Sequence, residues 1–250
     1  GEAASAGERP GGLQRQGGYV TQYSADLLVE MWDTRMPKSE FLGLAMWDGA
    51  SFPVGGTLFE WELGEPKGGS EDALTMKVSD LGVIEIVQQI GSTEFDELHD
   101  VRADETGLYI SGITTGVLGA QNLGDEDGIL LVWSQTLDLA EEVCRIQLGT
   151  SRRDGAEGVA VHGDYIFVGG NTEGVMNGDL PDGAACYHTD DNRLPDAYIA
   201  KYDKQCNHLW TREFGAFLGD AVEGLAVDDQ YGYATGYANA GADHLANFRH

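Results

Sequence analysis

Short runs of alternating apolar and polar residues, separated by Gly, Asp and Asn turns, dominate the chain. In one such run, Ile199 and Lys201 alternate with Tyr198, Ala200 and Tyr202. The runs are rich in Val, Ile, Tyr and Trp, and they have the two-residue period of a β-strand. No stretch of the chain sustains a helical period. The pattern therefore predicts an all-β fold of many short strands.

Three segments, beginning at Asp72, Asp127 and Asp196, align almost without gaps. In each, a glycine is followed after five residues by an aspartate and after sixteen more by a second glycine. The sets are Gly91, Asp96 and Gly112; Gly149, Asp154 and Gly170; and Gly215, Asp220 and Gly236. A weaker copy occupies residues 43–57. Four strand-like runs in a repeat of roughly 40–55 residues are typical of a β-propeller blade, here a four-stranded antiparallel sheet.

The strand-like runs can be assigned to successive blades. The first blade takes residues 43–56 and 72–90, the second 100–112 and 128–147, and the third 158–170 and 197–214. The fourth takes 224–236 and 243–249 and lacks its last strand. Two arrangements stay open: the run 27–32 supplies that strand and closes a four-bladed ring, or the chain is part of a larger propeller. We expect a flexible leader at 1–18 and a propeller domain at 19–250, with repeats near 27–71, 72–126, 127–195 and 196–250.

Four motifs of the last repeat, DAYIAKYD, HLWTREFG, GDAVEGLAVD and YATGYA, lie between residues 196 and 238. They resemble the repeats of the SBBP-type β-propeller family. The resemblance extends over about residues 25–250 and is weakest in the first repeat. It implies a propeller fold in a secreted or cell-surface protein. It implies little chemistry, because the family's biochemical roles are poorly defined.

The charge balance excludes several classes of partner. With 42 acidic and 15 basic residues the net charge is −27, so we expect no nucleic acid to bind the bare surface. No apolar run approaches 18 residues, so no membrane insertion is expected. The acidity suits a secreted protein in saline surroundings, where carboxylates maintain solubility.

The connections expected to be long share one face of the propeller, and this face is the predicted ligand-binding face. They comprise residues 57–71, 113–126, 171–195 and 237–243. His99, Glu157 and Glu223 occupy one repeated position and are predicted to line the channel mouth there. Trp61 lies in a long loop and is a candidate for stacking on a sugar ring. The alternative, that these side chains bind nothing, stays open.

Asp96, Asp154 and Asp220 have two interpretations. They form either a ring of carboxylates that binds cations or a set of turn residues that accept backbone hydrogen bonds. Their presence in every repeat favours the turn role, because a ligand site is needed only once.

A calcium site is the cofactor hypothesis. Clustered carboxylates in Gly-rich loops provide the oxygen ligands that Ca²⁺ takes, although the EF-hand spacing is absent. The alternative is a set of solvated acidic loops. The candidate ligands are Asp179, Asp182, Asp190 and Asp191 in the insertion at 173–196, and Asp125 and Asp127 in a second loop.

The three cysteines, Cys144, Cys186 and Cys206, have neither CxxC nor zinc-site spacing. Cys186 lies in the long-loop insertion and Cys206 in a turn on the opposite face, so a bridge between these two is not expected. We predict mostly free thiols, or one intermolecular bridge through Cys186.

Nucleophile, P-loop, zincin and Rossmann motifs are absent from the sequence. The leading hypothesis is therefore a non-enzymatic, extracytoplasmic β-propeller that binds a protein partner or a glycan within a surface or multi-protein assembly. Its compartment is extracellular, cell-surface, periplasmic or otherwise lumenal. The alternative is a polysaccharide-acting enzyme that uses paired carboxylates on the long-loop face.

Overall fold

The computed structural model describes residues 17–27, 29–57, 71–176, 194–215 and 219–239. Within these ranges the regular structure is β-strand, apart from one 3₁₀ turn at Leu139–Glu141. The strands form three four-stranded and two two-stranded antiparallel sheets. No helix in the described part of the chain is long and apolar enough to cross a membrane.

The three four-stranded sheets are the predicted complete blades, and each is a meander in chain order. Blade 1 contains β3 (Ser39–Trp47), β4 (Ala50–Thr57), β5 (Ala73–Val78) and β6 (Ile84–Ile90). Blade 2 contains β7 (Asp96–Asp104), β8 (Gly107–Thr114), β9 (Asp127–Trp133) and β10 (Glu142–Leu148). Blade 3 contains β11 (Asp154–His162), β12 (Tyr165–Thr172), β13 (Asp196–Asp203) and β14 (His208–Phe214).

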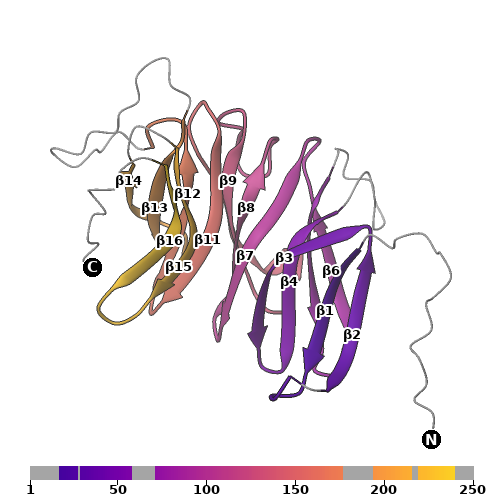
Figure 1. Ribbon diagram of the computed structural model, residues 1–250. Coiled ribbons are helices and arrows are strands. Elements are labelled where there is room, and N and C mark those ends of the chain that lie inside the picture. Colours follow the sequence, from indigo (N-terminus) through magenta and orange to yellow (C-terminus); the bar gives the residue numbers. More distant parts are fainter. Residues whose placement is uncertain (1–16, 28, 58–70, 177–193, 216–218, 240–250) are drawn as a thin grey trace, which may run out of the picture.

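A two-stranded hairpin lies at each end of this row of blades (Figure 1). The first pairs β1 (Gly17–Tyr23) with β2 (Glu30–Pro37), and the last pairs β15 (Asp220–Val227) with β16 (Gly232–Ala238). In the described residues the ring is not closed by the run 27–32, because β2 pairs with β1 and not with β16.

Packing against blade 1 holds the first hairpin in place. Val20 and Met36 join a buried apolar cluster with blade 1 residues that include Met76. The Trp32 indole donates a hydrogen bond to the carbonyl of Asp80, with an N···O distance of 2.9 Å. These contacts explain why β2 stays beside blade 1.

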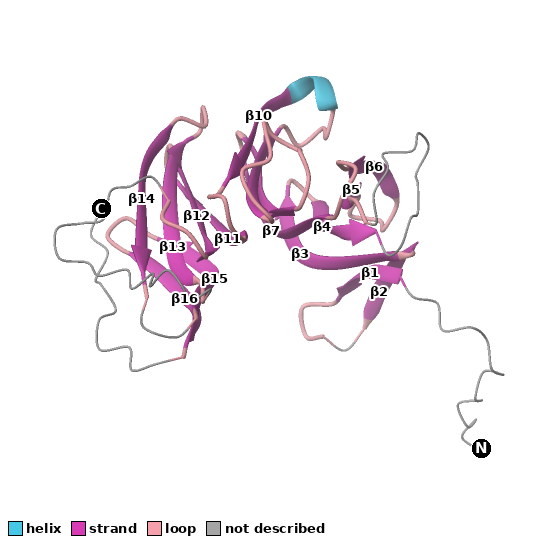
Figure 2. Cartoon of the chain, turned by 90° about the horizontal axis from the view of Figure 1, so that it is seen from above, coloured by secondary structure: helices cyan, strands magenta, loops and turns pink. Residues whose placement is uncertain are grey.

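The sheets follow an arc, with the first strand of each blade on its inner side (Figure 2). The inner strands β3, β7, β11 and β15 contact one another in that order. Blade 2 is therefore covered on both faces by neighbouring blades, which explains the continuous apolar run of β9, buried along its whole length. Residues near the start of one inner strand therefore lie close to the equivalent residues on the inner strand of the next blade.

Candidate ligand-binding site on the innermost strands

Every innermost strand carries a β-bulge at the same place. The pairing register shifts between Phe41 and Gly43, Leu98 and Asp100, Ala156 and Gly158, and Val222 and Gly224. A bulge inserts one unpaired residue and re-aims its side chain. The inserted residues are Leu42, His99, Glu157 and Glu223, so the repeated position singled out in the sequence is the bulge position.

The bulges of blades 2 and 3 bring His99 and Glu157 into contact. His99 Nδ1 lies 2.5 Å from Glu157 Oε2, an ion pair that crosses from β7 to β11. On the other side of the ring, His99 Nε2 lies 3.3 Å from Oε2 of Glu97. The His99 side chain is 14% exposed, so the imidazole is largely buried between two partly exposed carboxylates.

The two glutamates control the protonation of His99. Burial opposes the charged imidazolium, but the hydrogen bonds and charges of Glu157 and Glu97 outweigh it and raise the pKa of His99 from 6.5 to about 9. His99 is therefore an imidazolium at neutral pH, fixed between blades.

Glu97 was not among the predicted site residues. The repeats align it with Gly155 and Ala221, so repetition gave no signal for it. Its position two residues before His99 on one strand was the available clue, since residues i and i+2 share a strand face.

The other predicted members of the face lie in different surroundings. Glu223 is exposed on β15, and its backbone carbonyl approaches Gly158 of β11 closely enough that a Cβ there would be 3.2 Å away. Trp61 lies outside the described residues. The site thus presents carboxylate acceptors around one imidazolium, which suits ligands rich in hydroxyl or other donor groups.

Two of the three repeated aspartates, Asp96 and Asp154, have the turn-fixing role. Asp154 Oδ2 accepts hydrogen bonds from the Thr150 backbone N–H and hydroxyl, at 2.6 and 2.9 Å. Thr172 donates to Asp154 Oδ1. Asp96 is held in the same way by Ser92 and Thr114. These side chains fix the entry into the innermost strand and are buried.

The repeated glycine before each such aspartate also has a structural cause. A Cβ on Gly149 would lie 2.5 Å from Asp127 Oδ1 and 2.9 Å from Asp154 Oδ2. Gly215 is enclosed likewise by Asp196 and Asp220. Only glycine leaves room for the two carboxylates that meet where one blade joins the next.

The two calcium candidates of the second loop, Asp125 and Asp127, lie in different surroundings. Asp125 is exposed, whereas Asp127 is buried and accepts hydrogen bonds from the Leu123 N–H and the Gln147 amide, at 2.8 and 2.7 Å. No group of three or more His, Cys, Asp or Glu residues within the described ranges is arranged to hold a metal. Asp179, Asp182, Asp190 and Asp191 lie outside these ranges, so calcium binding there stays a prediction, testable by thermal unfolding in Ca²⁺ and in EGTA.

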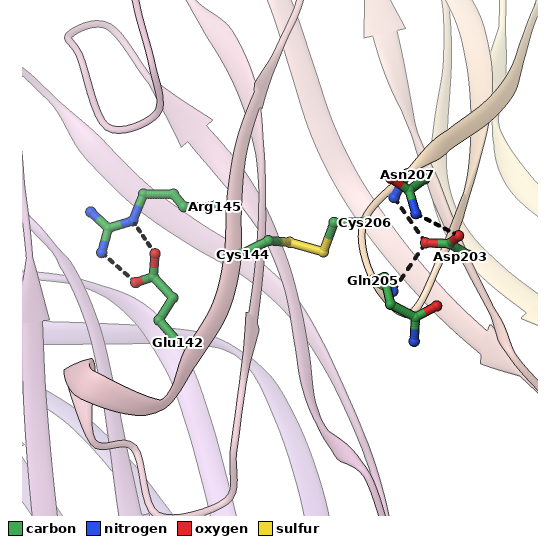
Figure 3. Close-up of a disulfide and its surroundings, with 7 residues drawn as sticks. All are labelled: Glu142, Cys144, Arg145, Asp203, Gln205, Cys206 and Asn207. Atoms are coloured by element: carbon green, nitrogen blue, oxygen red, sulfur yellow. Dashed lines mark hydrogen bonds and ion pairs between the residues drawn. A yellow bond between two sulfur atoms is a disulfide. The ribbon is translucent and has the colours of Figure 1, made fainter.

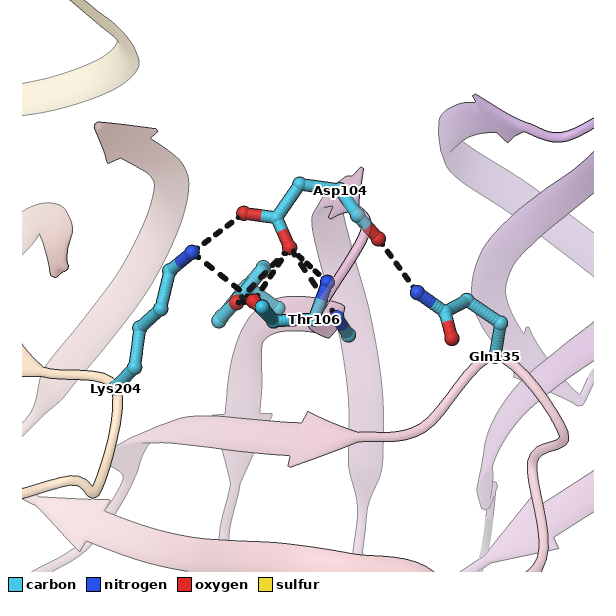
Figure 4. A network of polar contacts seen from close by, with 6 residues as sticks. Asp104, Thr106, Gln135 and Lys204 are labelled. Atoms are coloured by element: carbon cyan, nitrogen blue, oxygen red, sulfur yellow. Dashed lines mark hydrogen bonds and ion pairs between the residues drawn. The ribbon is translucent and has the colours of Figure 1, made fainter. Parts of the chain in front are cut away.

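A polar network joins blades 2 and 3 on the face of the tight turns (Figure 4). Lys204, in the β13–β14 turn, donates to Asp104 Oδ2 at 2.7 Å and to the Thr106 hydroxyl at 3.0 Å. Gln135 donates to the Asp104 carbonyl at 2.5 Å. Burial opposes the charge of Asp104, but Lys204 and Thr106 outweigh it and lower the pKa of this carboxyl.

A disulfide between Cys144 and Cys206 joins the same two blades (Figure 3). The prediction of mostly free thiols is wrong for this pair. Cys144 is on β10, and Cys206 is in the β13–β14 turn, whose Asp203 carboxylate accepts the Asn207 N–H at 2.8 Å. The outer strand of blade 2 passes this turn with the two Cα atoms 6.4 Å apart, within disulfide range. Only Cys186 was weighed as a partner of Cys206 from the sequence, because the passage of β10 beside this turn is a feature of the packed blades.

No known family model matches the sequence, and no curated protein matches it. The chain is similar to three solved β-propeller structures. The Neurospora crassa Pan2 WD40 domain has 10% identity and a TM-score of 0.48, over 84% of this chain and 49% of that one. A mutant of Synechocystis apocarotenoid oxygenase has 12% identity and a TM-score of 0.43, over 93% and 52%. The phage phi92 endosialidase has 14% identity and a TM-score of 0.42, over 85% and 31%.

The chain is a β-propeller protein. Its strand pairing carries this assignment: repeated four-stranded antiparallel blades whose first strands contact one another along an arc. The chain spans about half or less of the length of the three solved structures.

Proposed function

We propose that this β-propeller is an extracytoplasmic binding module of the SBBP type, which holds its ligand against the bulge residues of the innermost strands. The observation that carries the proposal is the contrast along these strands. The strand-entry position is Ser39 in blade 1 and aspartate in each later sheet, whereas the bulge position changes from Leu42 to His99 and then to Glu157 and Glu223. A position that varies on a fixed scaffold is available for recognition.

The ligand class we favour is a glycan. The carboxylates of Glu97, Glu157 and Glu223 accept hydrogen bonds, and sugar hydroxyl groups donate them. A protein partner that offers donor groups is the other occupant of this surface.

The test is affinity electrophoresis of the protein in gels that contain soluble polysaccharides, such as xylan, alginate and galactan. We expect at least one to retard the wild type and to lose its effect on an E157Q/E223Q variant. The matched control is Glu105→Gln, an exposed glutamate of the β7–β8 turn on the opposite face. Retardation that both variants keep would contradict the site.

Two further results would redirect the proposal. Absence of retardation by every polysaccharide would reject the glycan, and a photoreactive residue placed at 223 and at 105 would then test the protein partner. Release of reducing ends by the wild type, abolished in Glu157→Gln, would favour the polysaccharide-acting enzyme instead.

The compartment has its own test. The Cys144–Cys206 bridge supports an oxidising environment. Alkylation of the freshly isolated native protein, followed by mass spectrometry, should find both cysteines oxidised. Free thiols at both positions would contradict an extracytoplasmic location.

A further inference from the structure

Two buried carboxyl groups lie close to the same glycine where blade 2 joins blade 3. Asp127 begins β9, Asp154 begins β11, and both residues are 0% exposed. Asp127 Oδ1 and Asp154 Oδ2 each lie within 3 Å of the point that a Cβ of Gly149 would occupy. The pair is formed only when the two blades pack together.

The hydrogen bonds of the two carboxyl groups are unequal. Asp154 accepts from the Thr150 N–H and hydroxyl and from the Thr172 hydroxyl. Asp127 Oδ2 accepts two hydrogen bonds, but its buried Oδ1 has no donor in the part of the chain that the structure describes. A buried carboxylate oxygen without a donor is unfavourable, and a bound proton or cation relieves it.

No positive side chain in the described surroundings neutralises the pair. The Arg153 guanidinium pairs with Glu126 at 3.0 Å, and Arg152 donates to the Glu173 carbonyl at 3.4 Å. The buried Tyr198 of β13 is neutral, because burial and then nearby negative charges, including that of Asp154, raise its pKa well above 10. The ionisable groups around the pair are Asp125, Glu126, Arg152, Arg153, Glu157, Glu173 and Tyr198.

We propose that Asp154, beside the buried carboxyl group of Asp127, is a proton-binding site of the folded junction. A proton bound to Asp154 removes the repulsion between two neighbouring buried charges, as in other close carboxylate pairs. Burial, together with the charge of Asp127, raises the pKa of Asp154 from 3.8 to about 6, although Thr172 and Thr150 oppose the rise.

The consequence for stability has the opposite sign to that of an ion-paired aspartate. A pKa that is higher in the folded than in the unfolded chain means that the folded state binds the proton more tightly. The site therefore stabilises the fold as the pH falls through 6 toward 4 and loses this contribution as the pH rises above 6. Between pH 7 and 5 the folding equilibrium constant should rise by about tenfold from this site alone.

The direct test is a ¹³C NMR titration of the aspartate carboxyl groups in the full chain. We expect the Asp154 carboxyl to titrate near pH 6, and its midpoint to fall in Asp127→Asn, because the neighbouring charge is removed. An Asp154 carboxyl that is already ionised at pH 4.5 in the wild type would overturn the proposal. This measurement needs no substitution at Asp154 and is decisive if that variant fails to fold.

Urea denaturation at pH 7 and pH 5 provides the second test. On going from pH 7 to pH 5, the folding equilibrium constant of the wild type should rise about tenfold more than that of Asp154→Asn. The exposed control Asp164→Asn should show the same rise as the wild type. Equal gains in all three proteins would overturn the proposal. Stabilisation at pH 7 by K⁺ over choline at equal ionic strength, lost in Asp154→Asn, would show that a metal cation occupies the site instead.

Discussion

The junction between blades 2 and 3 and the junction between blade 3 and the β15–β16 hairpin share one device. At both, a glycine is enclosed by two buried aspartates, around Gly149 in the first case and Gly215 in the second. The first junction adds a disulfide, the Lys204–Asp104 contact and the His99–Glu157 pair. The repeated residues thus build the scaffold, and the residues that do not repeat make one junction different from the other.

Equivalent positions show how the second junction differs. Trp210 stands at the position of Cys144 and packs edge-to-face on Phe167 of its own blade, with ring centroids 6.3 Å apart. The bulge residues that flank this junction are Glu157 and Glu223, two like charges in place of a histidine and a glutamate. The position that carries the cross-link at the first junction therefore takes part in packing within one blade at the second.

The largest effect should follow from removing the disulfide. A C144S/C206S variant should lose about 4 kcal/mol of unfolding free energy, because the bridge closes a loop between residues 62 apart in the unfolded chain. Urea denaturation measures the loss. A reductant should lower the stability of the wild type equally and leave the variant unchanged; a loss below about 1 kcal/mol would remove this distinction between the junctions.

Substitution of the enclosed glycines tests the device that the junctions share. Gly149→Ala and Gly215→Ala should each cost about 3 kcal/mol, because the new methyl group would overlap two buried carboxylates. Gly232→Ala on β16 is the control, since no atom of the described residues lies within 4 Å of the place its methyl group would take, and it should change stability by less than about 0.5 kcal/mol. A large loss at only one of the two junction glycines would show that the device is not common to both.

His99→Gln should cost about 3 kcal/mol near pH 6.5 and almost nothing above pH 10. The folded-state pKa of about 9 exceeds the ordinary 6.5, so the stabilisation is complete below pH 6.5 and is lost as the pH rises through 9. Denaturation midpoints from pH 6 to 10 should converge for the two proteins. His162→Gln, which removes a contact with the exposed Asp229, should follow the wild-type curve.

The smallest effect is expected on the tight-turn face. Lys204→Met should cost about 1 kcal/mol, because Lys204 Nζ and the Asp104 carboxylate belong to side chains that are only 14% and 22% exposed. Arg35→Met removes a contact whose arginine is 68% exposed, and it should leave the midpoint of urea denaturation unchanged. Equal losses in the two variants would mean that the Lys204 contact adds nothing to the junction between blades 2 and 3.

Much of the scaffold could be predicted from the sequence, because the scaffold repeats. Gly149 and Asp154 recur at constant spacing since each junction needs the same turn and the same room for carboxylates. The bulge position was also found, since His99, Glu157 and Glu223 align. That these residues occupy bulges could not be foreseen, because a bulge shows itself only in the register with the next strand.

The cross-links between blades could not be predicted in the same way. Cys144 and Cys206 occupy different positions of the repeat, so alignment never brings them together. Glu97 aligns with a glycine and an alanine, and Lys204 reaches Asp104 across a separation of 100 positions in the chain. Such contacts depend on how neighbouring sheets are placed, which the periodicity of one strand does not reveal.

The bridge between Cys144 and Cys206 also determines how the molecule responds to a pulling force. A chain drawn out from its two ends would extend through every blade if the bridge were absent. With the bridge intact, the 62 residues of separation between the cysteines are withheld, which shortens the extended length by roughly 200 Å. The oxidation state of one pair of sulfur atoms therefore sets how far this protein can stretch.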